Sequence, residues 1–146
     1  MDMFNVYIIS MKRSNNAKID YSILFEKNNI IWYRFAKKTI DDGLGLIKGY
    51  LEAVRLAINF SKEHNLYIKI YCNQDLILPG RLENKINSSH KSTKKFKTEY
   101  CKEYVKFMDS NMSFYDIEII KTTENPYYKY GSRIMKTKFR SIHCKN

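Results

Sequence analysis

Polar residues with oxygen-bearing side chains stand at the ends of two apolar segments. The run 73–75, Asn-Gln-Asp, follows the apolar segment 66–72, and Asp41 and Asp42 precede a segment with helical periodicity. Many α/β proteins place their reactive groups at the carboxyl ends of strands. Converging carboxylates there would indicate metal-assisted chemistry, because paired dications need several acidic ligands to hold and neutralise them. Asn73, however, offers only a neutral oxygen.

The elements that must position these residues begin with three strands. Segments 5–10, 20–26 and 30–36 show strand periodicity, with Tyr21, Ile23 and Phe25 expected inward and the intervening residues of 22–26 outward. Residues 27–29, Lys-Asn-Asn, separate the last two, and asparagine tolerates the positive φ of a hairpin turn. Trp32 is expected in the core. The N-terminal residues 1–14 are interpreted as a strand and not as a signal peptide, because their charges follow the apolar stretch.

Residues 43–64 then have the period of an amphipathic helix. Asp41 or Asp42 is expected to cap its start, and His64 its end. The polar side of the helix is expected to face solvent and consists of Lys48, Glu52, Arg55, Asn59 and Lys62.

Four further segments complete the pattern. Residues 66–72 are expected to form a strand parallel to the first, because a helix connects the two. A basic loop is predicted near 80–97, an amphipathic helix over 97–109, a strand over 114–120 with Tyr115, Ile117 and Ile119 inward, and a last helix within 125–140. The order β-β-β-α-β-(loop)-α-β-α predicts one α/β domain over 1–146 with a mixed sheet covered by helices.

The charge distribution favours a polyanionic partner. The net charge is +11; residues 1–80 carry 11 basic and 8 acidic side chains, and residues 81–146 carry 15 and 7. Lysine outnumbers arginine 20 to 6, and Lys, Ile and Asn together make 51 residues, which indicates an A+T-rich genome. Because compositional bias does not concentrate charge in one half, nucleic-acid binding remains the preferred interpretation.

The cysteine pattern and the hydropathy indicate the cellular environment of the protein. Cys72, Cys101 and Cys144 are odd in number and widely spaced, which is typical of free thiols in a reducing, cytoplasmic environment. His143 and Cys144 form half of a metal site, and no second half has zinc-ligand spacing. No apolar run reaches the length of about 20 residues needed to span a membrane, and no membrane partner is expected.

Three phrases in this order of elements resemble the ribonuclease H family. "DDGLGLIKGYLEAVRLAI" resembles the family's first helix, "IYCNQDLI" its fourth strand and "YYKYGSRIMK" its last helix. The resemblance spans nearly the whole chain and implies a ribonuclease H-like fold. It also implies cleavage of the RNA strand of RNA–DNA hybrids by two Mg²⁺ ions held by four acids.

The four acidic positions map incompletely onto this sequence. The first-strand acid falls at Ser10 or Met11, and the fourth-strand acid at Asn73. The last-helix acid falls at Ser132 or Arg133, and the family's histidine at Thr123. Only the first-helix position keeps a carboxylate, at Asp42. The resemblance therefore implies a degenerate site with no metal, no cofactor and no catalytic residues. An alternative register would use Asp42, Asp75 and Asp41 with Mg²⁺ in an active nuclease.

Two basic regions are candidates for phosphate contacts. The first is the 90–106 stretch and the second the tail from Lys121, where tyrosines alternate with cations. The candidates are Lys91, Lys94, Lys95, Lys97, Lys102, Lys129, Arg133, Lys136, Lys138 and Arg140. For Lys102, an alternative to phosphate contact is equally consistent with the sequence: the residue could simply lie on a solvent-exposed helix face.

The sequence thus predicts an inactive, ribonuclease H-like protein that binds nucleic acid, RNA rather than DNA. Such a protein could belong to a ribonucleoprotein of a virus, a mobile element or a host of low G+C content. Two alternatives stay open. One is an active hybrid-cutting nuclease, and the other is a protein-interaction module that inhibits a nucleic-acid enzyme.

Overall fold

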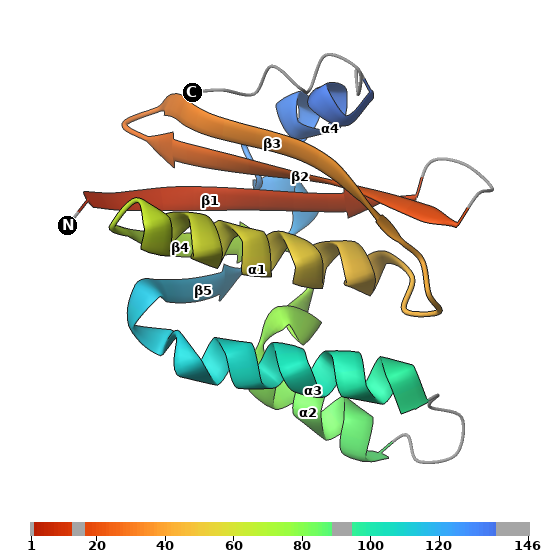
Figure 1. The fold of residues 1–146 in the computed structure, drawn as a ribbon. Coiled ribbons are helices and arrows are strands. Elements are labelled where there is room, and N and C mark those ends of the chain that lie inside the picture. The colour runs from red at the N-terminus through yellow and green to blue at the C-terminus, as the bar shows by residue number, and fades with distance from the viewer. Residues whose placement is uncertain (1, 13–16, 89–94, 137–146) are drawn as a thin grey trace.

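A mixed five-stranded sheet forms the centre of the computed structural model, which describes residues 2–12, 17–88 and 95–136. The strand order is β3-β2-β1-β4-β5 (Figure 1). β1 (Asp2–Met11), β2 (Lys18–Lys27) and β3 (Ile30–Ile40) form an antiparallel meander. β4 (Leu66–Cys72) pairs in parallel with β1, and β5 (Tyr115–Ile119) in parallel with β4. The three predicted strands and the parallel fourth strand are confirmed.

The β2–β3 turn is made by the predicted asparagines. Asn28 and Asn29 have φ angles of 55° and 66°. Positive φ at both central residues is what a two-residue hairpin of this hand requires, and asparagine reaches it more easily than most residues. The turn is held further by Glu26, whose carboxylate accepts a hydrogen bond from the Asn29 amide at 2.7 Å.

In the described part of the chain, four helices cover the two faces of the sheet (Figure 1). α1 (Leu46–Glu63), α2 (Pro79–Ser88) and α3 (Lys95–Ser110) lie on one side, and α4 (Tyr128–Lys136) lies on the other. Short 3-10 turns occupy 75–77, 112–114 and 122–124. α2 was not expected, since its residues fall in the predicted basic loop. Residues 89–94 of that loop lie outside the described residues.

Because α4 covers the second face, β2 is buried on both sides. Ser22, Leu24 and Glu26 were predicted to point to solvent, and that prediction is wrong: all three are buried. Gly131 of α4 sits so close that an added Cβ would lie 2.7 Å from Ile9 Cδ1 and 2.9 Å from Ser22 Oγ. The sheet is therefore the middle layer of three.

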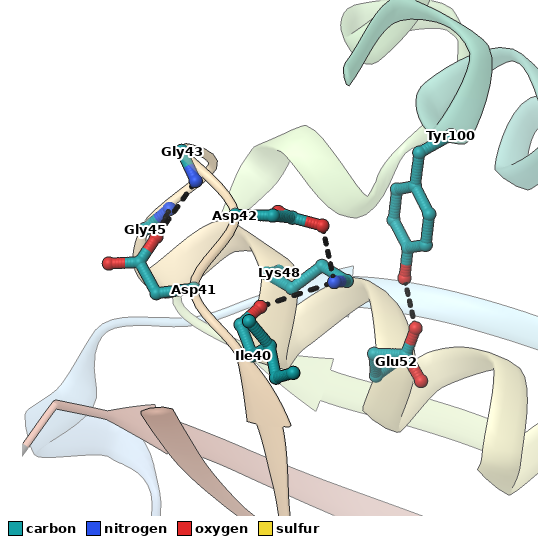
Figure 2. Close-up of polar contacts among 8 residues, drawn as sticks. All are labelled: Ile40, Asp41, Asp42, Gly43, Gly45, Lys48, Glu52 and Tyr100. Carbon is teal, nitrogen blue, oxygen red and sulfur yellow. Dashed lines mark hydrogen bonds and ion pairs between the residues drawn. The ribbon is translucent and has the colours of Figure 1, made fainter. Parts of the chain in front are cut away.

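The polar side of α1 is only partly exposed, because α3 lies against Lys48, Glu52 and Arg55, while Asn59 and Lys62 face solvent as predicted. Lys48 is buried, contrary to the prediction, and its ammonium group lies 4.9 Å from the centre of the Tyr100 ring. The Tyr100 hydroxyl donates to the Glu52 carboxylate, and Arg55 lies over the same ring at 5.7 Å. These contacts tie α1 to α3 through polar groups, and Figure 2 shows the hydrogen bond between Glu52 and Tyr100.

Four other expectations are corrected or confirmed. Trp32 is 49% exposed on the edge strand β3, and Ile119 is 36% exposed on the edge strand β5, so neither is in the core. The cap of α1 is Gly45, without a side-chain hydrogen bond, and not Asp41 or Asp42. His64 is the C-cap residue as predicted, with Nδ1 2.9 Å from the Phe60 carbonyl oxygen.

Two further findings concern the whole described part of the chain. Cys72 and Cys101 are buried and form no disulfide within the described residues, and burial raises the pKa of Cys72 to about 12. Cys144, His143 and the rest of 137–146 lie outside the described residues. None of the described helices is long and apolar enough to cross a membrane.

Candidate functional site

The carboxyl ends of β1 and β4 lie at one edge of the sheet, because these two strands are parallel neighbours. Ser10 stands near the end of β1 and is buried. Its hydroxyl donates to the Leu46 carbonyl oxygen at 3.0 Å. Gly49 lies directly against it, since an added Cβ would be 2.1 Å from Ser10 Oγ. The start of α1 therefore packs on Ser10 with no space for a longer side chain on either partner.

Asn73, directly after β4, belongs to a chain of neutral hydrogen bonds. The Tyr50 hydroxyl donates to Asn73 Oδ1 at 2.7 Å, and Asn73 Nδ2 donates to Thr122 Oγ1 at 2.6 Å. Burial raises the pKa of Tyr50 to about 12, with a smaller contribution from Cys72. Tyr50 therefore stays a neutral donor across the physiological range. Both functional groups of the Asn73 amide are occupied by protein partners.

Within the described residues, Asp42 forms no hydrogen bond with Ser10 or Asn73. Its Oδ2 accepts from the buried Lys48 ammonium at 2.7 Å, and the same ammonium donates to the Ile40 carbonyl oxygen at 3.2 Å (Figure 2). Its Oδ1 is buried and has no hydrogen-bond partner within the described residues. The carboxylate that the resemblance implied as a metal ligand is thus neutralised by a lysine on the α3 side of α1.

Asp41 turns away from Asp42 (Figure 2). Its carboxylate accepts from Lys12 at 2.9 Å and from the backbone amides of Gly43 and Gly45 at 3.1 Å each. These hydrogen bonds, that of Lys12 first, lower the pKa of Asp41 to about 2. Asp41 orders the turn before α1 rather than capping the helix.

Asp75, the third acid of the alternative register, lies in the 3-10 turn after β4. It accepts from Arg81 Nη1 of α2 at 3.1 Å. Asp41, Asp42 and Asp75 therefore each face a cation and do not converge. No group of three or more His, Cys, Asp or Glu residues that could hold a metal ion occurs within 2–12, 17–88 and 95–136.

The last-helix candidates lie beside a groove at the end of β1. Ser132 and Arg133 of α4 line it together with Met11, Tyr128, Lys129 and Lys136, and its volume is about 510 Å³. Ser132 Oγ is hidden from solvent and has no hydrogen-bond partner among the described residues. Tyr128 also lines the small pocket around Tyr50 and Asn73. The structure thus gathers Met11, Ser132 and Arg133 on one side of Tyr128, and Asn73 on the other.

These residues do not fit a pair of divalent cations. Magnesium prefers carboxylate and water oxygens and tolerates few departures from octahedral geometry. The edge offers instead a serine hydroxyl, a tyrosine hydroxyl and an amide, each already in a hydrogen bond to protein. The nearby groove carries the positive charge of Lys129, Arg133 and Lys136.

The predicted phosphate contacts fall into three groups. Lys102, Lys129, Arg133 and Lys136 are described and exposed. Lys95 and Lys97 belong to the start of α3, where only the backbone is described. Lys91, Lys94, Lys138 and Arg140 lie outside the described residues. The structure brings Lys129, Arg133 and Lys136 to one groove, while Lys102 is on α3, at the other side of the sheet (Figure 1).

Two residues of the site were not identified from the sequence. Tyr50 was assigned to the apolar stripe of α1, although a buried tyrosine hydroxyl usually needs a partner, which is the signal that could have linked it to Asn73. Thr122 was missed because its neighbour Thr123 matched the family's histidine position. Thr123 is exposed, and Thr122 is the residue that contacts Asn73.

The sequence matches no protein-family model and no curated protein. Solved structures are similar in fold. The ribonuclease H1 of the halophilic archaeon Halobacterium salinarum superposes with a TM-score of 0.64 at 9% identity, over 93% of this chain and 98% of that one. LC11 ribonuclease H1 in complex with an RNA/DNA hybrid gives 0.63 at 9%, over 93% and 99%.

The prototype foamy virus protease–reverse transcriptase is a third such structure. It gives a TM-score of 0.63 at 8% identity, over 98% of this chain and 21% of that one. All three likenesses cover nearly the whole chain and include its mixed sheet and its helices. This protein has a ribonuclease H-like fold.

Proposed function

We propose that this chain is a ribonuclease H-like protein that binds nucleic acid without cutting it. The observation that carries the proposal is the replacement of acidic positions by the neutral residues Ser10 and Asn73, each of which is already hydrogen-bonded within the protein. A two-metal cleavage site needs converging carboxylates, whereas Ser10, Tyr50 and Asn73 are uncharged and already have protein partners.

The remaining charge supports binding to a polyanion. The net charge of +11 is concentrated in residues 81–146, and α4 presents exposed cations from the same edge of the sheet. Lysine and arginine contacts to phosphates release counterions and supply sequence-independent affinity. LC11 ribonuclease H1 and the foamy virus enzyme have structures with an RNA/DNA hybrid, and the latter also with double-stranded DNA. We extend binding of this kind to the present chain, with RNA or a structured hybrid as the preferred ligand.

The test is a cleavage and binding assay on labelled RNA–DNA hybrid. We expect no cleavage by excess protein in Mg²⁺ or Mn²⁺, and binding that weakens linearly on a log–log plot against salt. Asp42→Asn should behave like the natural chain in both assays, because Asp42 is already paired with Lys48.

Two results would contradict the proposal. Cleavage that Asp42→Asn loses would establish an active nuclease. Hybrid and RNA binding that vanishes at about 150 mM salt, beside tight binding to one protein, would favour the inhibitor or interaction module.

A further inference from the structure

The groove between the end of β1 and α4 is a built feature of the fold. α4 is held against the sheet: Gly131 and Met135 on its inner face are buried, and Tyr127, the residue before the helix, packs on Tyr7 with ring centres 5.2 Å apart. On the β3 side, Arg34 donates to the Tyr130 hydroxyl at 2.8 Å. These contacts fix which face of α4 turns toward Met11, and hence the residues that line the groove.

The lining has the chemistry of a phosphate site. Lys129, Arg133 and Lys136 follow one another at spacings of four and three, so they share one face of the helix. They span about 10 Å along the axis. Among the described residues, the six that line the groove include three cations and no carboxylate. A chain of phosphates fits this row, and a divalent cation does not.

The groove also offers an aromatic ring. Tyr128 is half-buried and lines the groove beside Lys129, so its ring and the cations border the same space of about 510 Å³. Aromatic rings beside cations stack on bases while the cations hold the backbone. The base of a duplex is already stacked on its neighbours, whereas the base of a single strand is available.

From this geometry we infer that the α4 groove binds a single-stranded segment of nucleic acid, with phosphates on Lys129, Arg133 and Lys136 and a base on Tyr128. The inference rests on the proposed function and names its site and the form of the ligand. The groove adjoins the pocket around Tyr50 and Asn73, because Tyr128 lines both.

The experiment measures anisotropy of a labelled single-stranded RNA of about 12 nucleotides over a range of salt concentrations. Lys129→Gln/Lys136→Gln is compared with Lys37→Gln/Lys62→Gln, a control of equal charge at exposed positions outside the groove. Two lost phosphate contacts should lower the slope of log K against log salt by about 1.4 and weaken binding roughly 10-fold at about 150 mM salt. The control pair should leave the slope nearly unchanged.

The ring is tested separately. Tyr128→Leu should weaken binding by about 5- to 150-fold, the range observed for stacked bases, while Tyr128→Phe keeps the ring and should bind as the natural chain does. Thermal melting of each variant checks that the fold is retained. An RNA duplex of the same length should compete poorly.

The outcomes separate the inference from the proposed function. If the natural chain binds no nucleic acid, both are overturned. If the natural chain binds RNA and the two double variants behave alike, the groove is not the binding site, and the proposed function stands. If the duplex competes as well as the single strand, or if Tyr128→Leu binds normally, recognition of a single strand by stacking is overturned.

Discussion

Replacing Lys48 by methionine should destabilise the protein by about 2–4 kcal/mol, because Asp42 would lose its cation. Breaking a fully buried ion pair costs about 3–5 kcal/mol, and an exposed pair contributes about 0–1 kcal/mol. The side chain of Lys48 is 8% exposed and that of Asp42 is 25% exposed, so this pair lies nearer the buried limit. Methionine keeps the alkyl stem under the Tyr100 ring but loses both hydrogen bonds of the ammonium group.

The assay is urea denaturation at neutral pH, followed by far-ultraviolet circular dichroism. A double-mutant cycle with Asp42→Asn isolates the pair: the double variant should be more stable than the sum predicts by about 1–3 kcal/mol. Lys62→Met, at an exposed position of the same helix, should change stability by no more than about 0.5 kcal/mol.

Two results would refute this reasoning. One is a cost below about 1 kcal/mol for Lys48→Met, as for a surface pair. The other is additivity of the two substitutions within about 0.5 kcal/mol, which is the behaviour of independent sites. Lys48→Met should also gain no Mg²⁺-dependent cleavage of a hybrid, because freeing Asp42 leaves Ser10 and Asn73 neutral.

Three further predictions concern the edge of the sheet. Tyr50→Phe should cost about 1 kcal/mol in urea denaturation, since it removes one hydrogen bond and leaves exposed Asn73 open to water. Gly49→Ala should cost about 1–3 kcal/mol by overpacking against Ser10, and Ser10→Ala should recover part of that loss; full stability of Gly49→Ala would contradict the close approach. Burial raises the pKa of Tyr50 from 10.0 to about 12 in the folded protein. The contribution of Tyr50 to the free energy of unfolding is therefore complete below pH 10 and is lost as pH rises through 12. About 1.4 kcal/mol should be lost by about pH 11, and Tyr50→Phe should lose correspondingly less on the same pH series.

The succession of strands and helices was predictable because alternation and helical periodicity are local properties of the sequence. What periodicity could not show is which face a later element covers. Alternation alone predicted that Leu24 and Glu26 point to solvent, whereas both are buried because α4, about a hundred residues later in the sequence, covers that face of the sheet. Lys48 was likewise predicted to be exposed, whereas it is buried because α3 packs beside it. α2 was missed because Leu82 and Ile86 are its few apolar residues and Pro79-Gly80 resembles a turn.

The candidate site was predictable in part. The neutral residue at the end of β4 was visible in the sequence, and the structure places Asn73 at that edge. The hydrogen-bond partners were not visible, since Tyr50 and Thr122 come from segments 23 and 49 residues away. Pairing of Asp42 with Lys48 depends on the turn through Gly43 and Gly45, both at positive φ, which periodicity does not describe.

The parallel pairing of β1 with β4 has a consequence for the order in which the chain can fold. β1 can pair with β2 early, because only residues 12–17 separate them in the sequence, but its other edge cannot pair before residues 66–72 are made. The 54 residues between Met11 and Leu66 take roughly 3–11 s to synthesise at ribosomal rates. During that time the edge of β1 presents unpaired N–H and C=O groups beside apolar Phe4, Val6 and Ile8. Synthesis is therefore a stage at which an unpaired strand edge opens this protein to aggregation, and a slower ribosome would lengthen it.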